Sequence, residues 1–288
     1  MNVPHWIEVD GRRTRVRVAG DPDRPPILLL HGIGRSLEDW ASQFRLLAAS
    51  HRVIALDIPG FGFSARLREP SSLEVFAHGV ARTLDALGEN RPVHLVGNSL
   101  GGAVAMRLLV AAPERVASLT LVDSAGFGSE VTPLLRLLAV PGLGRLVAAH
   151  TTRAGARMLE RTIYADPALA TEARIEHALA IAEQPDPGSV TYEIARALAT
   201  WRGVRSRWRS ELLAAVAGHP RPTLLMWGDR DRVLPSHQLC AASHLIPHAR
   251  THLFAGIGHA PQMECPNEFA ELVTEFVGSL TEAGTQRG

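Results

Sequence analysis

The chain has 288 residues, 46% hydrophobic and 20% charged, which is enough material to bury one large core. Thirty basic residues nearly balance 29 acidic ones, and the formal charge of +1 gives no basic surface of the kind that binds nucleic acid. All the basic residues are arginine, which excludes mechanisms that need a catalytic lysine, such as a Schiff base. We therefore expect a globular protein without a nucleic-acid partner.

Two cysteines, Cys240 and Cys265, are too few for a disulfide framework or a four-cysteine zinc site. They indicate free thiols in a reducing compartment, and the helical pattern around Cys240 predicts that it is buried. The first residues lack the basic and apolar regions of a secretory signal. No apolar run reaches the roughly 20 residues of a membrane span. We expect a cytoplasmic protein that does not insert into a membrane.

In chain order, a hairpin signal around Asp10 and Gly11 comes first and predicts a sheet edge. Short runs rich in Val, Ile and Leu follow, each ending in glycine or an acid: PPILLLHG, HRVIALDIPG, PVHLVGNS, VASLTLVDSAG, RPTLLMWGD and ARTHLFAGIGH. Helix-length segments alternate with these runs, over residues 36–49, 71–87, 100–111, 235–246 and 266–280. This alternation predicts an α/β fold with a mostly parallel central sheet flanked by helices.

The alternation breaks once, over residues 126–219, where helical patterns occur without a convincing strand. We interpret this stretch as an inserted helical cap of about four helices, with residues 1–125 and 220–288 forming the core. Near its end, Trp201 and Trp208 are seven residues apart, a spacing that predicts one helical face packed on the core. The arginines between them are expected to be solvated, with recognition of an anion as the alternative.

The sharpest local signal is Gly97-Asn98-Ser99-Leu100-Gly101, between an apolar strand and a helical segment. In a nucleophile elbow, small residues two before and two after the serine let the backbone turn tightly. The helix that follows directs its first N–H groups at the site, so the Leu100 amide can stabilise an oxyanion. The alternative is a plain glycine-rich turn between strand and helix.

A serine nucleophile needs a base, and a triad also needs an acid that orients the base. Among 13 histidines, His259 lies in a glycine-rich loop after the last predicted strand, at the sheet edge expected for Ser99. Asp231 follows the strand after the insertion and is our candidate acid. Asp229 is expected to serve the turn, and Asp123 is the alternative acid.

The loop His31-Gly32-Ile33-Gly34 follows the third predicted strand. Its glycines allow close approach of the backbone, and the Ile33 amide is the expected second oxyanion donor. We expect His31 to be a hydrogen-bonded structural residue.

Together these segments resemble the α/β-hydrolase superfamily, in the branch that holds meta-cleavage-product C–C hydrolases and many carboxylesterases and lipases. The resemblance covers essentially the whole chain and rests on five motifs in order: HGIGRSLEDW, DIPGFGFS, GNSLGG, WGDRDRVLP and GIGHAPQMECP. It implies hydrolysis by Ser99, Asp231 and His259, with oxyanion donors at Ile33 and Leu100.

Two departures separate the chain from C–C hydrolases that it resembles. Those enzymes usually carry a tryptophan after the catalytic histidine and an arginine on a cap helix, where this chain has Ala260 and Ala178; Arg174 lies one turn earlier. We therefore predict a cofactor-free and metal-free serine hydrolase that cleaves a carboxylic ester of a small to medium hydrophobic substrate. The alternatives are C–C bond hydrolysis, cofactor-free perhydrolysis, and a ligand-binding protein without turnover.

Overall fold

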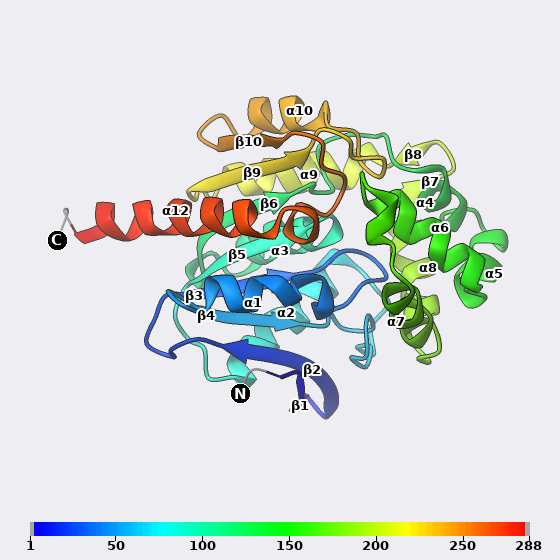
Figure 1. Cartoon of the computed structure of the whole chain (residues 1–288), viewed down its shortest axis with the longest axis horizontal. Helices are drawn as coiled ribbons and strands as arrows, with labels where there is room; N and C mark the ends of the chain where they lie inside the picture. The colour runs from blue at the N-terminus through cyan, green and yellow to red at the C-terminus, as the bar shows by residue number, and fades with distance from the viewer. Residues whose placement is uncertain (1–2, 286–288) are drawn as a thin grey trace.

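In the computed structural model, which describes residues 3–285, an eight-stranded sheet lies between two layers of helices (Figure 1). The strand order is β1-β2-β4-β3-β5-β6-β9-β10. The strands are β1 (His5–Val9), β2 (Arg12–Ala19), β3 (Pro26–Leu30), β4 (Arg52–Leu56), β5 (Val93–Asn98), β6 (Val116–Val122), β9 (Thr223–Gly228) and β10 (Arg250–Phe254). Pairing is parallel from β4 to β10, whereas β2 is antiparallel to both β1 and β4. The predicted α/β fold, a mostly parallel central sheet flanked by helices, is confirmed.

The N-terminal hairpin is also confirmed, with β1 at the edge of the sheet. Its two turn residues, Asp10 and Gly11, have φ values of 49° and 75°. Positive φ at both central positions is what a tight two-residue hairpin requires, and the Asp-Gly pair accepts it at low cost.

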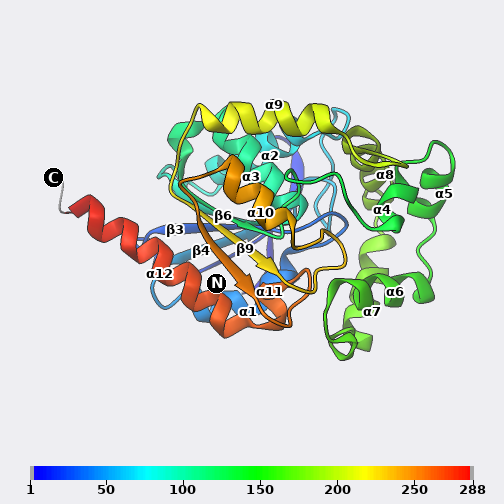
Figure 2. The same cartoon turned by 90° about the horizontal axis from the view of Figure 1, so that it is seen from above.

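The central strands are buried on both faces, and their alternate side chains feed two separate cores. In β3, Leu28 and Leu30 join one core, whereas Ile27 and Leu29 join the other. Helices on the first side are α2 (Leu73–Ala86), α3 (Leu100–Ala111), α9 (Ser206–Ala217) and α10 (Gln238–Leu245), and those on the second are α1 (Ala41–Leu47) and α12 (Pro266–Thr285) (Figure 2). The layers fix the strand ends from which the site is built.

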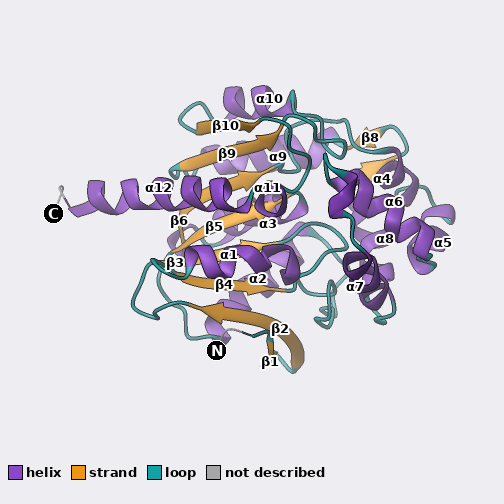
Figure 3. Ribbon diagram, viewed as in Figure 1, coloured by secondary structure: helices purple, strands orange, loops and turns teal. Residues whose placement is uncertain are grey.

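Five α-helices of the described chain gather beyond the carboxyl ends of the strands (Figures 1 and 3). They are α4 (Pro133–Leu138), α5 (Leu143–Ala149), α6 (Arg153–Ile163), α7 (Glu172–Ala182) and α8 (Pro187–Leu198), and we call them the cap helices. Threonine side chains cap α4, α6 and α7 by accepting a backbone N–H of the first turn. The expectation of about four helices and no strand was wrong, since a short hairpin, β7 (Ala199–Thr200) with β8 (Gly203–Val204), follows α8. Helix α9, which the sequence placed in the insertion, packs against α3.

That hairpin also overturns the prediction for the two tryptophans. Trp201 sits at its turn with 65% of its surface exposed, because the chain is not helical there. Trp208 lies in α9, half-buried, and its indole N–H donates to the Leu198 carbonyl at 2.8 Å. Cys240 was predicted to be buried but is exposed on the outer side of α10. Among residues 3–285, no helix combines the length and apolar character needed to span a membrane.

Candidate active site

Ser99 lies at the turn between β5 and α3, with φ 56° and ψ −119°. Such a backbone is strained for a residue with a side chain, and it is held here by hydrogen bonds to the next strand. The Ser99 N–H donates to the Val122 carbonyl at 2.9 Å. A Cβ atom on Gly97 would lie 2.4 Å from the Gly101 carbonyl oxygen, so the turn closes only with glycine. The geometry is that of a nucleophile elbow.

His259 and Asp231 form a buried pair, in which the imidazole Nδ1 lies 2.7 Å from Asp231 Oδ2. The other oxygen of Asp231 accepts the N–H groups of Val233 at 2.6 Å and Leu234 at 2.9 Å. These two bonds fix the carboxylate, and the carboxylate fixes the imidazole. The amide of Asn98 donates to the His259 carbonyl at 3.0 Å, which ties the histidine loop to the strand that carries Ser99.

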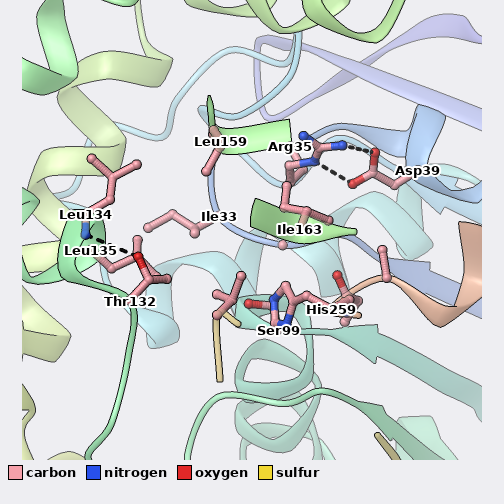
Figure 4. Close-up of a pocket in the computed structure, with 14 residues that line it drawn as sticks. Ile33, Arg35, Asp39, Ser99, Thr132, Leu134, Leu135, Leu159, Ile163 and His259 are labelled. Atoms are coloured by element: carbon pink, nitrogen blue, oxygen red, sulfur yellow. Dashed lines mark hydrogen bonds and ion pairs between the residues drawn. The ribbon is translucent and has the colours of Figure 1, made fainter. Parts of the chain in front are cut away.

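Two small cavities meet at Ser99. The first, of about 50 Å³, is lined by Ser99, His259 and Ile33, and Figure 4 shows Ser99 beside His259 at one end of it. The second, of about 70 Å³, is lined by apolar side chains together with Ser99, Ile33 and Leu100. Of the two predicted oxyanion donors, Ile33 lines both cavities, and Leu100, the first residue of α3, lines the second.

The other residues of the loop after β3 hold the loop in place beside Ser99. His31 donates from Nδ1 to the Gly32 carbonyl at 2.8 Å and accepts the Ile58 N–H at Nε2 at 3.0 Å. Burial lowers its pKa, so both ring nitrogens of a neutral imidazole serve the fold. A Cβ atom on Gly32 would lie 3.3 Å from the Ser99 Cβ, and Gly34 has φ 68°.

Asp123, the alternative acid, lies beside the pair. Atoms of Asp123, Asp231 and His259 that could bind a metal lie within 4.8 Å of one another, the one such group in the described part of the chain. His259 Nδ1 and both oxygens of Asp231 already form hydrogen bonds. The three residues are therefore better suited to holding protons than to binding a metal ion. Burial, and then the negative charge of Asp231, raise the pKa of Asp123 well above its usual range.

The sequence analysis missed a buried charge network at the far end of the first cavity. Arg35 forms two bonds of 2.8 Å with Asp39 and pairs with Glu160 of α6 (Figure 4 shows the Asp39 bonds). Arg174 of α7 contacts Asp39 at 2.8 Å and Glu160 at 3.1 Å. Burial is the largest single effect and opposes ionisation of Asp39, but the charge and hydrogen bonds of Arg35, together with the charge of Arg174, outweigh it and lower the pKa of Asp39. The i,i+4 spacing of Arg35 and Asp39 was the available signal.

The fold and the geometry of this site point to one class, the hydrolases of the α/β fold. Comparison with known families agrees, because the family model described as the alpha/beta hydrolase fold matches residues 25–266. The chain belongs to the alpha/beta hydrolase fold family.

Individual relatives carry different names. The chain is 32% identical over 276 residues to a dihydrolipoyllysine-residue acetyltransferase component of the acetoin cleaving system from Pseudomonas putida, covering 95% of this chain and 69% of that one. It is 32% identical over 266 residues to a 2-hydroxymuconate semialdehyde hydrolase from Pseudomonas sp. (strain CF600), covering 90% and 88%. A mutant of a meta-cleavage product hydrolase from Pseudomonas fluorescens IP01 superposes with a TM-score of 0.80, at 27% identity over 96% of this chain and 98% of that one. The chain is thus similar to the C–C hydrolase branch.

Proposed function

We propose that this protein is a serine hydrolase that cleaves a carboxylic ester through an acyl-enzyme on Ser99. The observation that carries the proposal is that Ser99 lines the same cavity as His259, whose imidazole is hydrogen-bonded to Asp231. A serine hydroxyl is a weak nucleophile until a base takes its proton, and His259 is the base in this proposal.

In the first step His259 Nε2 removes the Ser99 proton as Oγ attacks the ester carbonyl, and Asp231 stabilises the imidazolium. The carbonyl oxygen becomes an oxyanion that accepts the amides of Ile33 and Leu100. His259 then gives its proton to the leaving alcohol, whose C–O bond breaks. In the second step His259 activates a water molecule, which hydrolyses the acyl-enzyme and restores Ser99. Asn98 and the glycines of both loops (Gly32, Gly34, Gly97 and Gly101) support this geometry without entering the chemistry.

C–C bond cleavage is the second candidate, because 2-hydroxymuconate semialdehyde and meta-cleavage product hydrolases are among the relatives. The charges near Ser99 favour the ester. Substrates named for that branch include dienoates and dienedioates, which carry carboxylates. The one arginine that lines the Ser99 cavity, Arg35, is already neutralised by Asp39 and Glu160. A carboxylate would have to displace one of these acids, whereas a neutral ester would not.

We also propose that the substrate is a small to medium hydrophobic ester. We propose the cytoplasm as the compartment because both cysteines are free thiols, as expected in a reducing environment. The mechanism needs no metal or organic cofactor. Perhydrolysis would use the same residues with peroxide in place of water, and a protein that only binds its ligand would not need Ser99.

The test is a fluorophosphonate probe on the wild type and on Ser99→Ala, together with turnover of p-nitrophenyl esters and of a 2-hydroxy-6-oxo-dienoate. We expect labelling and ester turnover that are both lost in Ser99→Ala. Labelling with turnover of the dienoate alone would move the assignment to C–C hydrolysis. No labelling, with ligand binding that survives Ser99→Ala, would indicate a protein that binds without catalysis.

A further inference from the structure

The cap helices enclose a cavity of about 640 Å³, far larger than the two cavities at Ser99. Small-molecule sites usually measure about 300–1,000 Å³, so this cavity alone has room for most of a substrate. Its volume depends on small side chains at helix contacts, among them Gly155, Ala178 and Gly188. Leu146 and Met158, which line it, are 61% and 57% exposed, so the cavity opens to solvent between α5 and α6 through an apolar mouth.

This cap cavity shares lining residues with only the first of the two Ser99 cavities. Arg35, Leu134 and Leu159 line both the cap cavity and the cavity that contains Ser99 and His259. Figure 4 shows Leu134 and Leu159 away from Ser99 and His259, toward the cap. The second Ser99 cavity shares none of its lining residues with the cap cavity.

The reaction chemistry indicates which part of the ester lies in each of the two Ser99 cavities. The histidine must hand its proton to the leaving oxygen, so the leaving group lies on the side of Ser99 where His259 is. That side is the first cavity, which adjoins the cap cavity through the lining residues that the two share. The acyl group then takes the second cavity, which is apolar, contains Ile33 and Leu100, and has only about 70 Å³.

Resting on the proposed ester hydrolysis, we propose that the substrate is an ester of a short acyl group with a long, flexible apolar alcohol, and that the alcohol chain occupies the cap cavity. Each buried methylene is worth up to about fourfold in kcat/KM. From methyl acetate to octyl acetate we therefore expect a gain on the order of 100-fold, smaller than the full product because the cavity opens to solvent and part of the chain stays hydrated. Lengthening the acyl group beyond butyrate should instead lower kcat/KM.

The decisive variant is Ala178→Phe, which fills the cap cavity from α7. Its matched control is Ala173→Phe, on the same helix but exposed and outside the cavity lining. We expect Ala178→Phe to lower kcat/KM for octyl acetate at least tenfold while methyl acetate is unchanged, and Ala173→Phe to change neither. Equal effects of both variants, or a preference set by acyl length, would overturn the proposal.

The failure of ester hydrolysis can be told apart from the failure of this inference. If the wild type hydrolyses no ester, the proposed function fails, and binding of 1-octanol to Ser99→Ala, measured by calorimetry, still decides the cap cavity. Binding that is lost when Ala178→Phe is added would support an apolar chain in the cavity. No binding, or binding that the filled variant keeps, would overturn it.

A second inference rests on a separate observation, the carboxyl group of Asp123. This side chain is fully buried, its Oδ1 accepts the Gly228 N–H at 2.9 Å, and its Oδ2 has no hydrogen-bond partner. An unpartnered oxygen is costly inside a protein unless it carries a proton and donates it. The nearby acceptor for this proton is the carboxylate of Asp231. Ligand-type atoms of Asp123, Asp231 and His259 all lie within 4.8 Å of one another.

We infer that Asp123 is a positioning residue: a protonated acid that donates a hydrogen bond to Asp231 and can replace it as the partner of His259. When Asp231→Asn removes the neighbouring negative charge, ionisation of Asp123 becomes easier, and the carboxylate then lies within reach of the imidazole. Loss of a triad acid costs about 10⁴-fold in kcat where nothing replaces it.

The test compares kcat for Asp231→Asn, Asp123→Asn and the double variant. We expect Asp231→Asn to lose about 10²-fold, the double variant about 10⁴-fold, and the residual activity of Asp231→Asn to rise with pH as Asp123 ionises. If Asp123→Asn does not fold, Asp231→Asn is compared with His259→Ala instead. Equal activity of Asp231→Asn and either the double variant or His259→Ala would overturn the inference, as would a pH profile of Asp231→Asn identical to that of the wild type.

Discussion

The core and the cap hold their parts of the site in different ways. In the core the reacting groups are fixed by main-chain hydrogen bonds: two amides hold Asp231, and the Ser99 backbone bonds to β6. The cap meets the core through a few main-chain bonds, such as the His259 N–H to the Ile163 carbonyl at 2.7 Å, and through buried charged side chains, with Glu160 and Arg174 meeting the loop after β3. Main-chain bonds do not depend on pH, whereas ion pairs do. We therefore expect the core to set the chemistry and the cap attachment to respond to single charges and to acid.

The largest expected effect comes from the core. His259→Ala removes the base, so kcat for ester hydrolysis should fall on the order of 10⁴-fold or more. The melting temperature should change little, since the bonds that hold Asp231 to the backbone remain. His237→Ala is the matched control, because that histidine follows Asp231 in the same segment but its side chain is 65% exposed. Comparable turnover in His259→Ala and the control would refute the assignment of the base.

Breaking the buried charge network should give the next largest effect. Glu160→Gln leaves Arg35 and Arg174 with Asp39 alone as a buried acid, and removing one partner from a buried ion pair typically costs about 3–5 kcal/mol. Since both arginines keep Asp39, we expect about 3 kcal/mol, or roughly 6–12 °C in the melting temperature. Calorimetry would measure it.

Glu172→Gln is the control for this change, since Glu172 pairs with Arg153 and Arg157 on the exposed side of the cap. Exposed pairs contribute little, and we expect no measurable shift in the melting temperature. If both variants melted alike, the cap would not depend on its buried charges, and the contrast between core and cap would fail.

Low pH should also weaken the contact between the cap and the core, with a smaller effect on the melting temperature. Glu38, in the loop after β3, is bonded to Arg15 and to Ser36, and lies 3.4 Å from His177 of α7. Burial favours the neutral form, but hydrogen bonds from His177, Arg15 and Ser36 outweigh it and lower the pKa of Glu38 below its usual value. A lowered pKa adds stability above the unfolded value of about 4.3, and this stability is lost as pH falls toward the folded value.

We therefore expect the melting temperature of the wild type to exceed that of Glu38→Gln by a few degrees at pH 7, and this gap to narrow steadily as the pH falls below about 4.5 toward pH 3. Melting curves across this range for both proteins provide the measurement. A gap that stayed constant down to pH 3 would mean that Glu38 contributes by shape and not by charge.

The difference between core and cap also explains what the sequence could predict. The elbow, the hairpin, His259 and Asp231 are marked by local signals: glycines at fixed spacing and polar residues directly after apolar strands. The partners of Arg35 and Asp39 lie more than 120 residues away on cap helices, and no local pattern brings Glu160 and Arg174 to them. The cap cavity is the space left between small side chains, which only the packed helices define. Trp201 and Cys240 were misplaced because helical spacing alone does not tell which side faces the core, or that a hairpin interrupts the helix.

The smallest expected effect probes how rigid the core is beside His259. Cys265 lies six residues after His259, is half-buried, and donates its S–H to the Pro261 carbonyl at 3.3 Å. Burial raises its pKa to about 12, so little thiolate forms at pH 8, whereas Cys240 is exposed. We expect iodoacetamide at pH 8 to label Cys240 alone, to leave activity intact, and to label nothing in Cys240→Ser when detected by mass spectrometry. Labelling of Cys265, with a loss of activity that substrate prevents, would show that the chain after His259 opens readily. The core would then not be rigid around its catalytic base, His259.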